Sequence, residues 1–198
     1  MIVLLSRSPA NIKTPPLFQW VHCAHAWRSY ARNRELVMKI ENNAAVIPFT
    51  KVALPFGWLG NMAPFPVQFD GVWWRTTEAL FQALRFPVGS PVRNEIWKQG
   101  SPMAAKMISK RCKAERVVEP CCDADLNNMR MCLDLKLKTH RKVCDGLLAT
   151  TGKILVEDVS NRPRKSDPWG MKLVDGAWVG ENLLGSLWME IRDGQGLN

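Results

Sequence analysis

One stretch in the middle of the chain carries three polar side chains whose spacing suits acid–base chemistry and anion binding. Glu78, Gln82 and Arg85 are spaced i, i+4, i+7, so they share one face if the stretch is helical. On that face the Glu78 carboxylate could act as an acid or a base, and the Arg85 guanidinium could hold an anion. The alternative is a solvated helix face on which Glu78 only interacts favourably with the helix dipole.

A second group of residues, nearer the C-terminus, has the types that bind a nucleotide. Trp169 offers a flat ring for stacking on a base, and Gly170 beside it permits close approach of the main chain. Asp167 could polarise a sugar hydroxyl or a water molecule. Asn182 stands where the last helix should begin, and the open N–H groups of a helix start suit phosphate. The alternative is a structural tryptophan flanked by glycine turns.

A third segment, residues 57–65, contains the pair Gly60-Asn61. Such a pair commonly forms a turn that needs a positive φ, and it could equally present the Asn61 amide to a ligand. The chain has no P-loop, no dinucleotide-binding glycine fingerprint, no serine nucleophile elbow and no H-E-x-x-H zinc motif. Several common enzyme classes are thereby excluded, and the three polar segments remain as the candidate site.

The elements that must position these residues follow from turn and capping signals. Asp70-Gly71 lies between two short apolar runs and predicts a β-hairpin over residues 67–74. Helices are predicted at 76–86, 91–98, 101–111, 125–137, 141–149 and 182–192, a strand at 153–157, and a strand pair or loop at 172–178. This mixture is mainly helical α+β rather than a regular series of βαβ units.

The first part of the chain differs in pattern from the rest. Residues 1–37 carry scattered Trp, His and Arg without a helical or strand period, and a more regular pattern begins at Met38. We predict a poorly ordered N-terminal extension over residues 1–45 and one compact domain over residues 46–198, long enough for a sizeable core. The alternative for the extension is a basic arm that contacts an anionic partner.

The composition is that of a folded protein with an excess of positive charge. Lys plus Arg total 27 against 18 Asp plus Glu, which gives a formal net charge of +9. This balance suits an anionic partner such as a nucleotide, a phosphorylated small molecule or nucleic acid, or else reflects a solvated lysine-rich surface. No stretch is long and apolar enough to cross a bilayer and no signal peptide is recognisable, so we expect a cytoplasmic protein without a membrane partner.

The six cysteines predict neither disulfides nor a metal site. None sits in a C-x-x-C pair, and the adjacent Cys121 and Cys122 suit neither two ligands of one metal nor an ordinary disulfide. Cys23 has His neighbours but no second cluster with the spacing of a zinc finger. We therefore expect free thiols in a reducing compartment, with no bound metal and no cofactor.

Taken in chain order, these pieces resemble the NADAR/YbiA-like family over roughly residues 52–192. The matching residues ahead of the hairpin and on the first helix are Phe56, Gly60, Asn61, Phe65, Glu78, Arg85 and Phe86. Those in the middle of the chain are Met129, Leu133, Lys136, Leu147, Leu148, Gly152 and the strand Leu155-Val156-Glu157. Those at the end are Asp167, Trp169, Gly170, Gly180, Asn182, Gly185, Met189 and Arg192.

The resemblance implies a compact, mainly helical α+β domain that hydrolyses the C1′–N bond between ribose and a base. The implied substrates are ADP-ribose on guanine, including ADP-ribosylated nucleic acid, or a phosphorylated ribosylaminopyrimidine of riboflavin synthesis. Cleavage builds positive charge on C1′, which a carboxylate stabilises, and the leaving base needs a proton. The expected catalytic residues are Glu78, Asp167 and Arg85. The expected substrate-binding residues are Gly60, Asn61, Gln82, Lys136, Trp169, Gly170 and Asn182.

Several positions depart from the family pattern, among them Gly60 in place of Ser, Leu137 in place of Phe, Arg85 and Cys121. Arg85 stands where the family usually has Lys, and a guanidinium can bind phosphate but cannot act as an amine nucleophile. Cys121 lies near a position that tends to be Trp. Three functions therefore stay open, in this order: a working N-glycosidase, a catalytically weak relative that binds a nucleotide or ADP-ribosyl group, and a basic nucleic-acid-binding domain. Trp73, Trp74 and Trp188 are expected in the core rather than on a binding surface.

Overall fold

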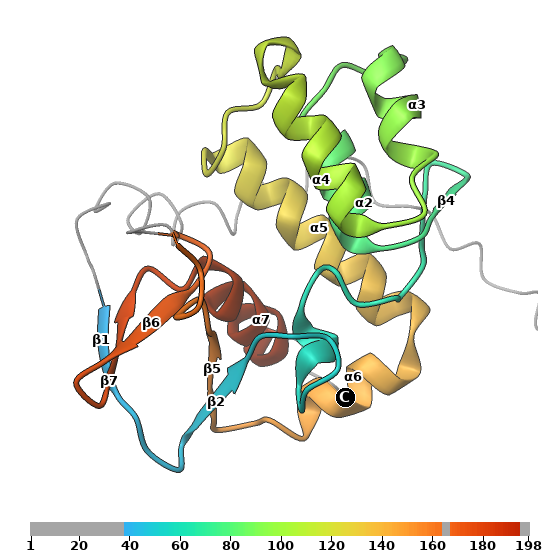
Figure 1. Cartoon of the computed structure of the whole chain (residues 1–198). Coiled ribbons are helices and arrows are strands. Elements are labelled where there is room, and N and C mark those ends of the chain that lie inside the picture. Colours follow the sequence, from blue (N-terminus) through green and yellow to red (C-terminus); the bar gives the residue numbers. More distant parts are fainter. Residues whose placement is uncertain (1–37, 164–166, 195–198) are drawn as a thin grey trace, which may run out of the picture. The chain divides into compact units, whose positions relative to one another are not determined.

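The structure, a computed structural model, describes residues 38–163 and 167–194. These residues belong to a compact unit that begins at Val37. In Figure 1, helices α2 (Thr77–Ala83) to α5 (Asp123–Thr139) and strand β4 (Val72–Trp74) lie on one side of this unit, and the other labelled strands lie with α7 (Leu183–Gly194) on the other. The predicted class, mainly helical α+β, is confirmed. The prediction of a poorly ordered segment within residues 1–37 falls outside the described residues.

The strands form three small sheets. In the first, β1 (Met38–Glu41), β7 (Ala177–Gly180) and β6 (Met171–Val174) are antiparallel, with β7 in the middle. In the second, β2 (Val46–Phe49) pairs in parallel with β5 (Ile154–Glu157), which ends at Glu157. The third is the predicted hairpin of β3 (Val67–Phe69) and β4 (Val72–Trp74). Asp70 and Gly71 both have positive φ, as the tight hairpin turn requires.

The first strand corrects the predicted domain boundary. We expected the N-terminal extension to reach residue 45, but β1 pairs along its whole length with β7, with Ile40 opposite Trp178. The side chains of Met38 and Ile40 pack against a buried cluster that includes Val46 and Trp178. Residues 38–41 therefore belong to the sheet, because their alternating apolar side chains complete its core, and residues 42–45 connect this strand to β2.

Three of the described helices begin directly after a residue whose side chain caps them. The helices are α2 (Thr77–Ala83), α3 (Pro91–Trp97), α4 (Pro102–Arg111), α5 (Asp123–Thr139), α6 (Arg141–Leu148) and α7 (Leu183–Gly194), with short 3₁₀ turns η2 (Gly57–Leu59) and η3 (Lys113–Glu115). Thr76, Ser90 and Ser101 each accept a hydrogen bond from a first-turn N–H. Pro91 and Pro102 follow two of these caps, at positions where a proline costs no helical hydrogen bond.

Helix α5 joins the two sides of the unit, since it packs against α2, β3, α6 and α7. Helix α7 in turn packs on β5, and the predicted apolar face of α7 is buried. Gly185 permits this close packing, because a Cβ there would overlap the carbonyl oxygen of Leu155. Trp188 is fully buried and its Nε1 donates to the carbonyl of Leu59 at 2.9 Å. The end of β5 is thus fixed beside the start of α7.

The tryptophan prediction is confirmed at two positions and wrong at one. Trp74 and Trp188 are buried as expected, whereas Trp73 is 55% exposed. Successive residues of a strand point to opposite faces, so Trp74 turns inward and Trp73 turns outward. Trp97 on α3 is also exposed, and its Nε1 donates to the carbonyl of Trp73 at 2.9 Å.

Two sequence-based expectations concern membranes and thiols. Of the helices in the described residues, none is long and apolar enough to span a membrane. The predicted cytoplasmic location stays a prediction. Cys112, Cys122, Cys132 and Cys144 are free thiols, and burial raises the pKa of Cys132 well above its ordinary value.

Candidate active site

The polar face of α2 is buried rather than solvated. Glu78, Gln82 and Arg85 are 5%, 3% and 6% exposed, because α3, α4 and α5 pack around this short helix. The alternative of a solvated helix face is therefore wrong. Side chains of this polarity enter an interior only when they are paired, so their partners define what this face does.

A chain of hydrogen bonds orders the three side chains. Gln82 donates from Nε2 to Oε1 of Glu78 at 2.9 Å, and Arg85 donates from Nη1 to Oε1 of Gln82 at 3.2 Å. Arg85 also donates from Nε and Nη2 to the two carboxylate oxygens of Asp125, both at 2.7 Å. Asp125, at the start of α5, is fully buried and accepts a further bond from the N–H of Cys121. Arg85 is thus neutralised by Asp125 and aligns Glu78 through Gln82.

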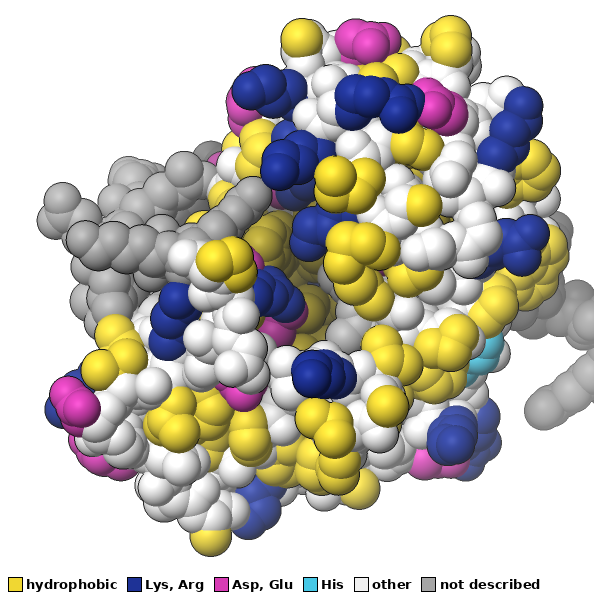
Figure 2. Space-filling view, viewed as in Figure 1, with side chains coloured by type: hydrophobic (Ala, Val, Ile, Leu, Met, Phe, Trp, Pro, Cys, Tyr) yellow, Lys and Arg dark blue, Asp and Glu magenta, His cyan; other side chains and the backbone are white. Residues whose placement is uncertain are grey.

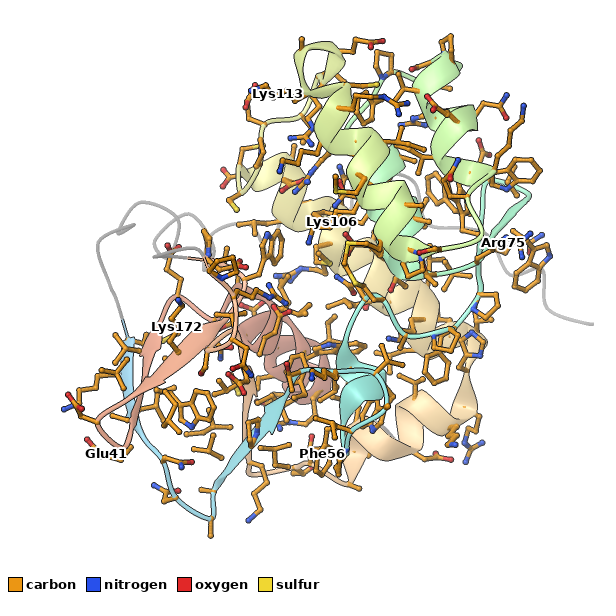
Figure 3. The ribbon with its side chains drawn as sticks, in the orientation of Figure 1. Glu41, Phe56, Arg75, Lys106, Lys113 and Lys172 are labelled. Carbon is orange, nitrogen blue, oxygen red and sulfur yellow. The ribbon has the colours of Figure 1, made fainter. Side chains whose placement is uncertain are left out.

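Lys106 of α4 approaches the same carboxylate from the surface. Its Nζ lies 3.9 Å from Oε1 of Glu78, and its side chain is 48% exposed. Figure 2 shows a hollow in the face between the helices and the strands, with acidic and basic side chains gathered in it. Figure 3, in the same orientation, places Lys106 at the edge of this region, which we call the central hollow. Lys106 also acts electrostatically on Glu157, so both carboxylates belong to its surroundings.

On the strand side of the site one arginine, Arg162, bonds to two carboxylates, those of Glu157 and Asp167, and we call this group of three the clamp. Arg162 donates from Nη2 to Oε1 of Glu157 at 2.7 Å and from Nη1 to Oδ2 of Asp167 at 2.6 Å. Glu157 is 9% exposed, and its other oxygen, Oε2, is buried without a hydrogen-bond partner. Burial raises the pKa of Glu157, and the positive charge of Arg162 opposes that rise. The clamp thus combines a buried carboxylate oxygen that has no hydrogen-bond partner with an arginine side chain that is 39% exposed.

Trp169 connects the clamp to α2. Its ring meets that of Phe81 edge to face, with centroids 5.5 Å apart and an interplanar angle of 82°. The guanidinium of Arg85 lies over the other ring, 4.4 Å from the centroid of Phe81. The N–H of Trp169 donates to Oδ1 of Asp167 at 3.3 Å. The structure therefore brings Glu78, Gln82, Arg85, Asp167 and Trp169 into one region.

Three other predicted residues hold the loop before α2. Asn61 donates to the sulfur of Met129, and its carbonyl accepts from the N–H of Glu78 at 3.1 Å. Lys136 is fully buried, donates to the carbonyls of Trp58 and Gly60 at 2.6 and 3.0 Å, and has its pKa lowered to about 7 by burial. These contacts position the first turn of α2, and we therefore regard Gly60, Asn61 and Lys136 as supports for Glu78.

The turn predicted at Gly60-Asn61 has a different geometry from the expected one. Gly60 has φ −67°, in the extended region, and the positive φ falls on Phe56, at 60°. The sequence pointed to the right loop but not to the residue that carries its unusual backbone conformation. The Gly60 carbonyl accepts hydrogen bonds from both the Lys136 ammonium and the N–H of Ala63.

The remaining predicted residues serve the main chain of β5. A Cβ on Gly170 would overlap the carbonyl oxygen of Glu157, so the missing side chain serves packing rather than ligand approach. Asn182 is fully buried, accepts from the N–H of Glu157 at 3.1 Å and donates to the carbonyl of Leu155 at 2.8 Å. The first N–H groups of α7 donate to the carbonyls at 168 and 169. The expectation of open N–H groups for a phosphate at this helix start is therefore wrong.

Four residues of this region were absent from the sequence prediction of the site: Lys106, Asp125, Glu157 and Arg162. Asp125 and Lys106 lie on helices far along the chain from α2, and no local pattern links them to Glu78. Glu157 was noted only as the last residue of a strand. A signal did exist for Arg162, because it belongs to the charged loop that also contains Asp167.

Comparison with known proteins decides the family. The sequence profile of the NADAR domain matches residues 48–194, from within β2 to the end of α7. The chain belongs to the NADAR family. The resemblance inferred from the sequence is thereby confirmed, and the NADAR domain includes every side chain of the central hollow described above.

Two kinds of relative extend this finding. The proteins called N-glycosidase YbiA from Escherichia coli strain K12 and from Shigella boydii serotype 4 are each 34% identical to this NADAR chain over 149 residues, which is 75% of this chain and 87% of theirs. The NMR structure of E. coli YbiA is similar with a TM-score of 0.63 at 29% identity, covering 78% of this chain and 87% of that one. These likenesses support a glycosidase-type function.

A metal centre was not expected in this domain. Within residues 38–163 and 167–194, no group of three or more His, Cys, Asp or Glu side chains is placed to hold a metal ion.

Proposed function

We propose that this chain is a hydrolase that cleaves the C1′–N bond joining ribose to a nitrogen base, in a phosphorylated ribosyl or ADP-ribosyl compound. The observation that carries the proposal is the position of Glu78: a buried carboxylate, aligned by Gln82, at a hollow that also has a cation and an aromatic ring. The NADAR relatives named N-glycosidase support the same reaction type.

Glu78 is the residue best suited to the reacting carbon. Its Oε1 is held by Gln82 and Lys106, whereas Oε2 has no hydrogen-bond donor among the described residues. Cleavage of a C1′–N bond gives C1′ oxocarbenium character, which a nearby carboxylate stabilises. In this proposal Glu78 stabilises that charge and accepts a proton from the attacking water.

The neighbouring groups bind and orient the substrate. Trp169, held against Phe81, supplies a ring on which a base or nicotinamide-like group can stack. Lys106 and Arg162 are partly exposed cations that suit phosphate oxygens. Asp167 orients Arg162 and Trp169, and Arg85 fixes Gln82, so we assign both of these predicted catalytic residues a positioning role.

The substrate class has two candidates, an ADP-ribosylated guanine and a phosphorylated ribosylaminopyrimidine. Both contain a C1′–N bond and phosphate, so the cations of the central hollow suit either. ADP-ribose carries two phosphates, which would use both Lys106 and Arg162, and for this reason we place it first.

A catalytically inactive relative that only binds such a compound is the second candidate. The observation that favours it is Arg85, which stands where the family usually has Lys and is already committed to Asp125. If the reaction needs an amine at that position, this chain cannot supply it there, because a guanidinium stays protonated.

Base release from defined substrates tests the proposal. The purified chain is incubated with ADP-ribosylated guanine in an oligonucleotide and with a ribosylaminopyrimidine phosphate, and released base is separated by chromatography. We expect release from one substrate by the wild type and a loss of at least about a hundredfold in Glu78→Gln. A matched control, Glu95→Gln, changes an exposed glutamate of α3 and should retain full activity. Binding of ADP-ribose without release of any base would support the inactive relative.

A further inference from the structure

Glu157 is a buried carboxylate of the central hollow to which the proposed reaction has given no role. It lies at the end of β5, is 9% exposed, and has one oxygen, Oε2, buried without a hydrogen-bond partner. A buried acceptor without a partner is costly, and such groups in a native protein commonly have a functional reason. A carboxyl group that carries a proton at such an atom becomes a donor and can bond to a ligand nitrogen.

The groups that face Glu157 are two cations and one anion. Arg162 bonds directly to its Oε1, Lys106 of α4 acts on it from across the hollow, and Asp167 competes with it for Arg162. Burial raises the pKa of Glu157, whereas Arg162 and Lys106 lower it. The protonation state of Glu157 therefore depends on whether Arg162 stays in place.

Arg162 is able to change partners. Its side chain is 39% exposed, while the carboxylates that it bridges are 12% and 11% exposed. A phosphate that enters the hollow can accept two parallel hydrogen bonds from a guanidinium, the same geometry that the carboxylates now use. Asp167 also accepts the N–H of Trp169, whereas Glu157 is the last residue of β5.

We propose that Glu157 is the proton donor to the leaving base, and that a substrate phosphate activates it by drawing Arg162 away. This inference rests on the proposed function, since it assigns the second carboxyl group of the same reaction. Binding of a phosphorylated substrate thereby places a proton on Glu157, and a compound without phosphate leaves Glu157 paired with Arg162. The protein would thus select phosphorylated ribosides by their effect on its acid as well as by contact.

The proton and electron balance of the step is complete with one water. The C1′–N bond breaks with its electron pair on nitrogen, and the Glu157 carboxyl gives its proton to that nitrogen. Water forms the new C1′–O bond and loses a proton to Glu78. The products are the base with an added hydrogen and a sugar with a hydroxyl at C1′. Solvent then removes the proton from Glu78 and supplies a new proton to Glu157.

Proton uptake on ligand binding tests this inference without any turnover. ADP-ribose, whose terminal ribose carries no base, is titrated into the protein at pH 6.5 in buffers that differ in ionisation enthalpy. We expect net uptake of a proton, up to one per bound ligand, in the wild type and none in Glu157→Gln, which still binds. Glu95→Gln is the matched control, because Glu95 also pairs with an arginine, Arg111, but at the surface. Uptake that is absent in the wild type or unchanged in Glu157→Gln overturns the inference.

A second measurement needs no ligand. The carboxyl carbon of Glu157 is titrated by NMR in the wild type and in Arg162→Met. We expect the pKa of Glu157 to be higher in the variant, because burial remains and the cation is gone. If the pKa of Glu157 is unchanged in Arg162→Met, then Arg162 does not set the protonation state of Glu157 and the inference is wrong. Failure of ADP-ribose to bind at all, with a raised pKa in Arg162→Met, rules out ADP-ribosyl compounds as the substrate class and leaves the coupling of the clamp intact.

Discussion

Replacing Asp125 with Ala would leave the Arg85 guanidinium buried without its partner. The pair is joined by two hydrogen bonds of 2.7 Å, and the side chains are 7% and 0% exposed. Removing one member of such a buried pair typically costs about 3–5 kcal/mol, because the other charge stays uncompensated. The N–H of Cys121 loses its acceptor as well. For a domain of this size each kcal/mol corresponds to about 2–4 °C, so we expect the midpoint of thermal unfolding to fall by roughly 6–20 °C.

Urea unfolding, followed by tryptophan fluorescence, measures this loss, and two further variants interpret it. The double variant Arg85→Met with Asp125→Leu should recover most of the stability, because apolar side chains of similar volume replace the pair. Arg111→Ala, which breaks the exposed pair with Glu95, should change stability by less than about 1 kcal/mol. If Asp125→Ala loses no more than Arg111→Ala, then Arg85 is not held as described and its positioning role is wrong.

Three further predictions concern the support of Glu78, the packing of β5 and the mouth of the hollow. Burial lowers the pKa of Lys136 from 10.5 to about 7. Between these two pH values the unfolded chain binds more protons than the folded protein, so the free energy of unfolding rises with pH. In urea unfolding at several pH values, Lys136→Met should flatten that rise. Gly170→Ala should cost about 1–3 kcal/mol in thermal unfolding, because its Cβ meets the carbonyl of Glu157. Lys106→Ala should weaken ADP-ribose binding in calorimetry while stability changes by less than about 1 kcal/mol, since its pair with Glu78 is half exposed.

Features that depend on neighbouring residues, such as turns, helix starts and helix faces, could be predicted from the sequence. The hairpin follows from Asp70-Gly71, whose two positive φ angles suit one turn type, and the helix starts follow from Ser90 and Ser101 with proline after them. The shared face of Glu78 and Gln82 follows from helical spacing and is confirmed by their direct hydrogen bond. Signals of this kind act within a few residues, so one sequence contains all that is needed.

The contacts that the site residues make in the folded protein could not be predicted, because their partners are distant in the chain. Asp125 lies forty residues beyond Arg85 and decides whether that guanidinium binds a ligand or is neutralised. The strand at Met38 becomes recognisable only when it pairs with β7, far along the sequence. Asn182 has the type and place of a ligand-binding residue, yet both its amide atoms bond to β5. In each case the role of the residue depends on a partner that is distant in the sequence, and the spacing of residues along the chain does not reveal that partner.

The central claim is that water attacks C1′ while Glu78 receives its proton, and oxygen labelling tests this most directly. The reaction is run in water enriched in oxygen-18 with the wild type and with Glu78→Gln, and the sugar and base products are analysed by mass spectrometry. The account predicts the label on the C1′ hydroxyl of the sugar, an unlabelled base, and a rate at least about a hundredfold lower in Glu78→Gln. Label on the base, or an equal rate in Glu78→Gln, would contradict it.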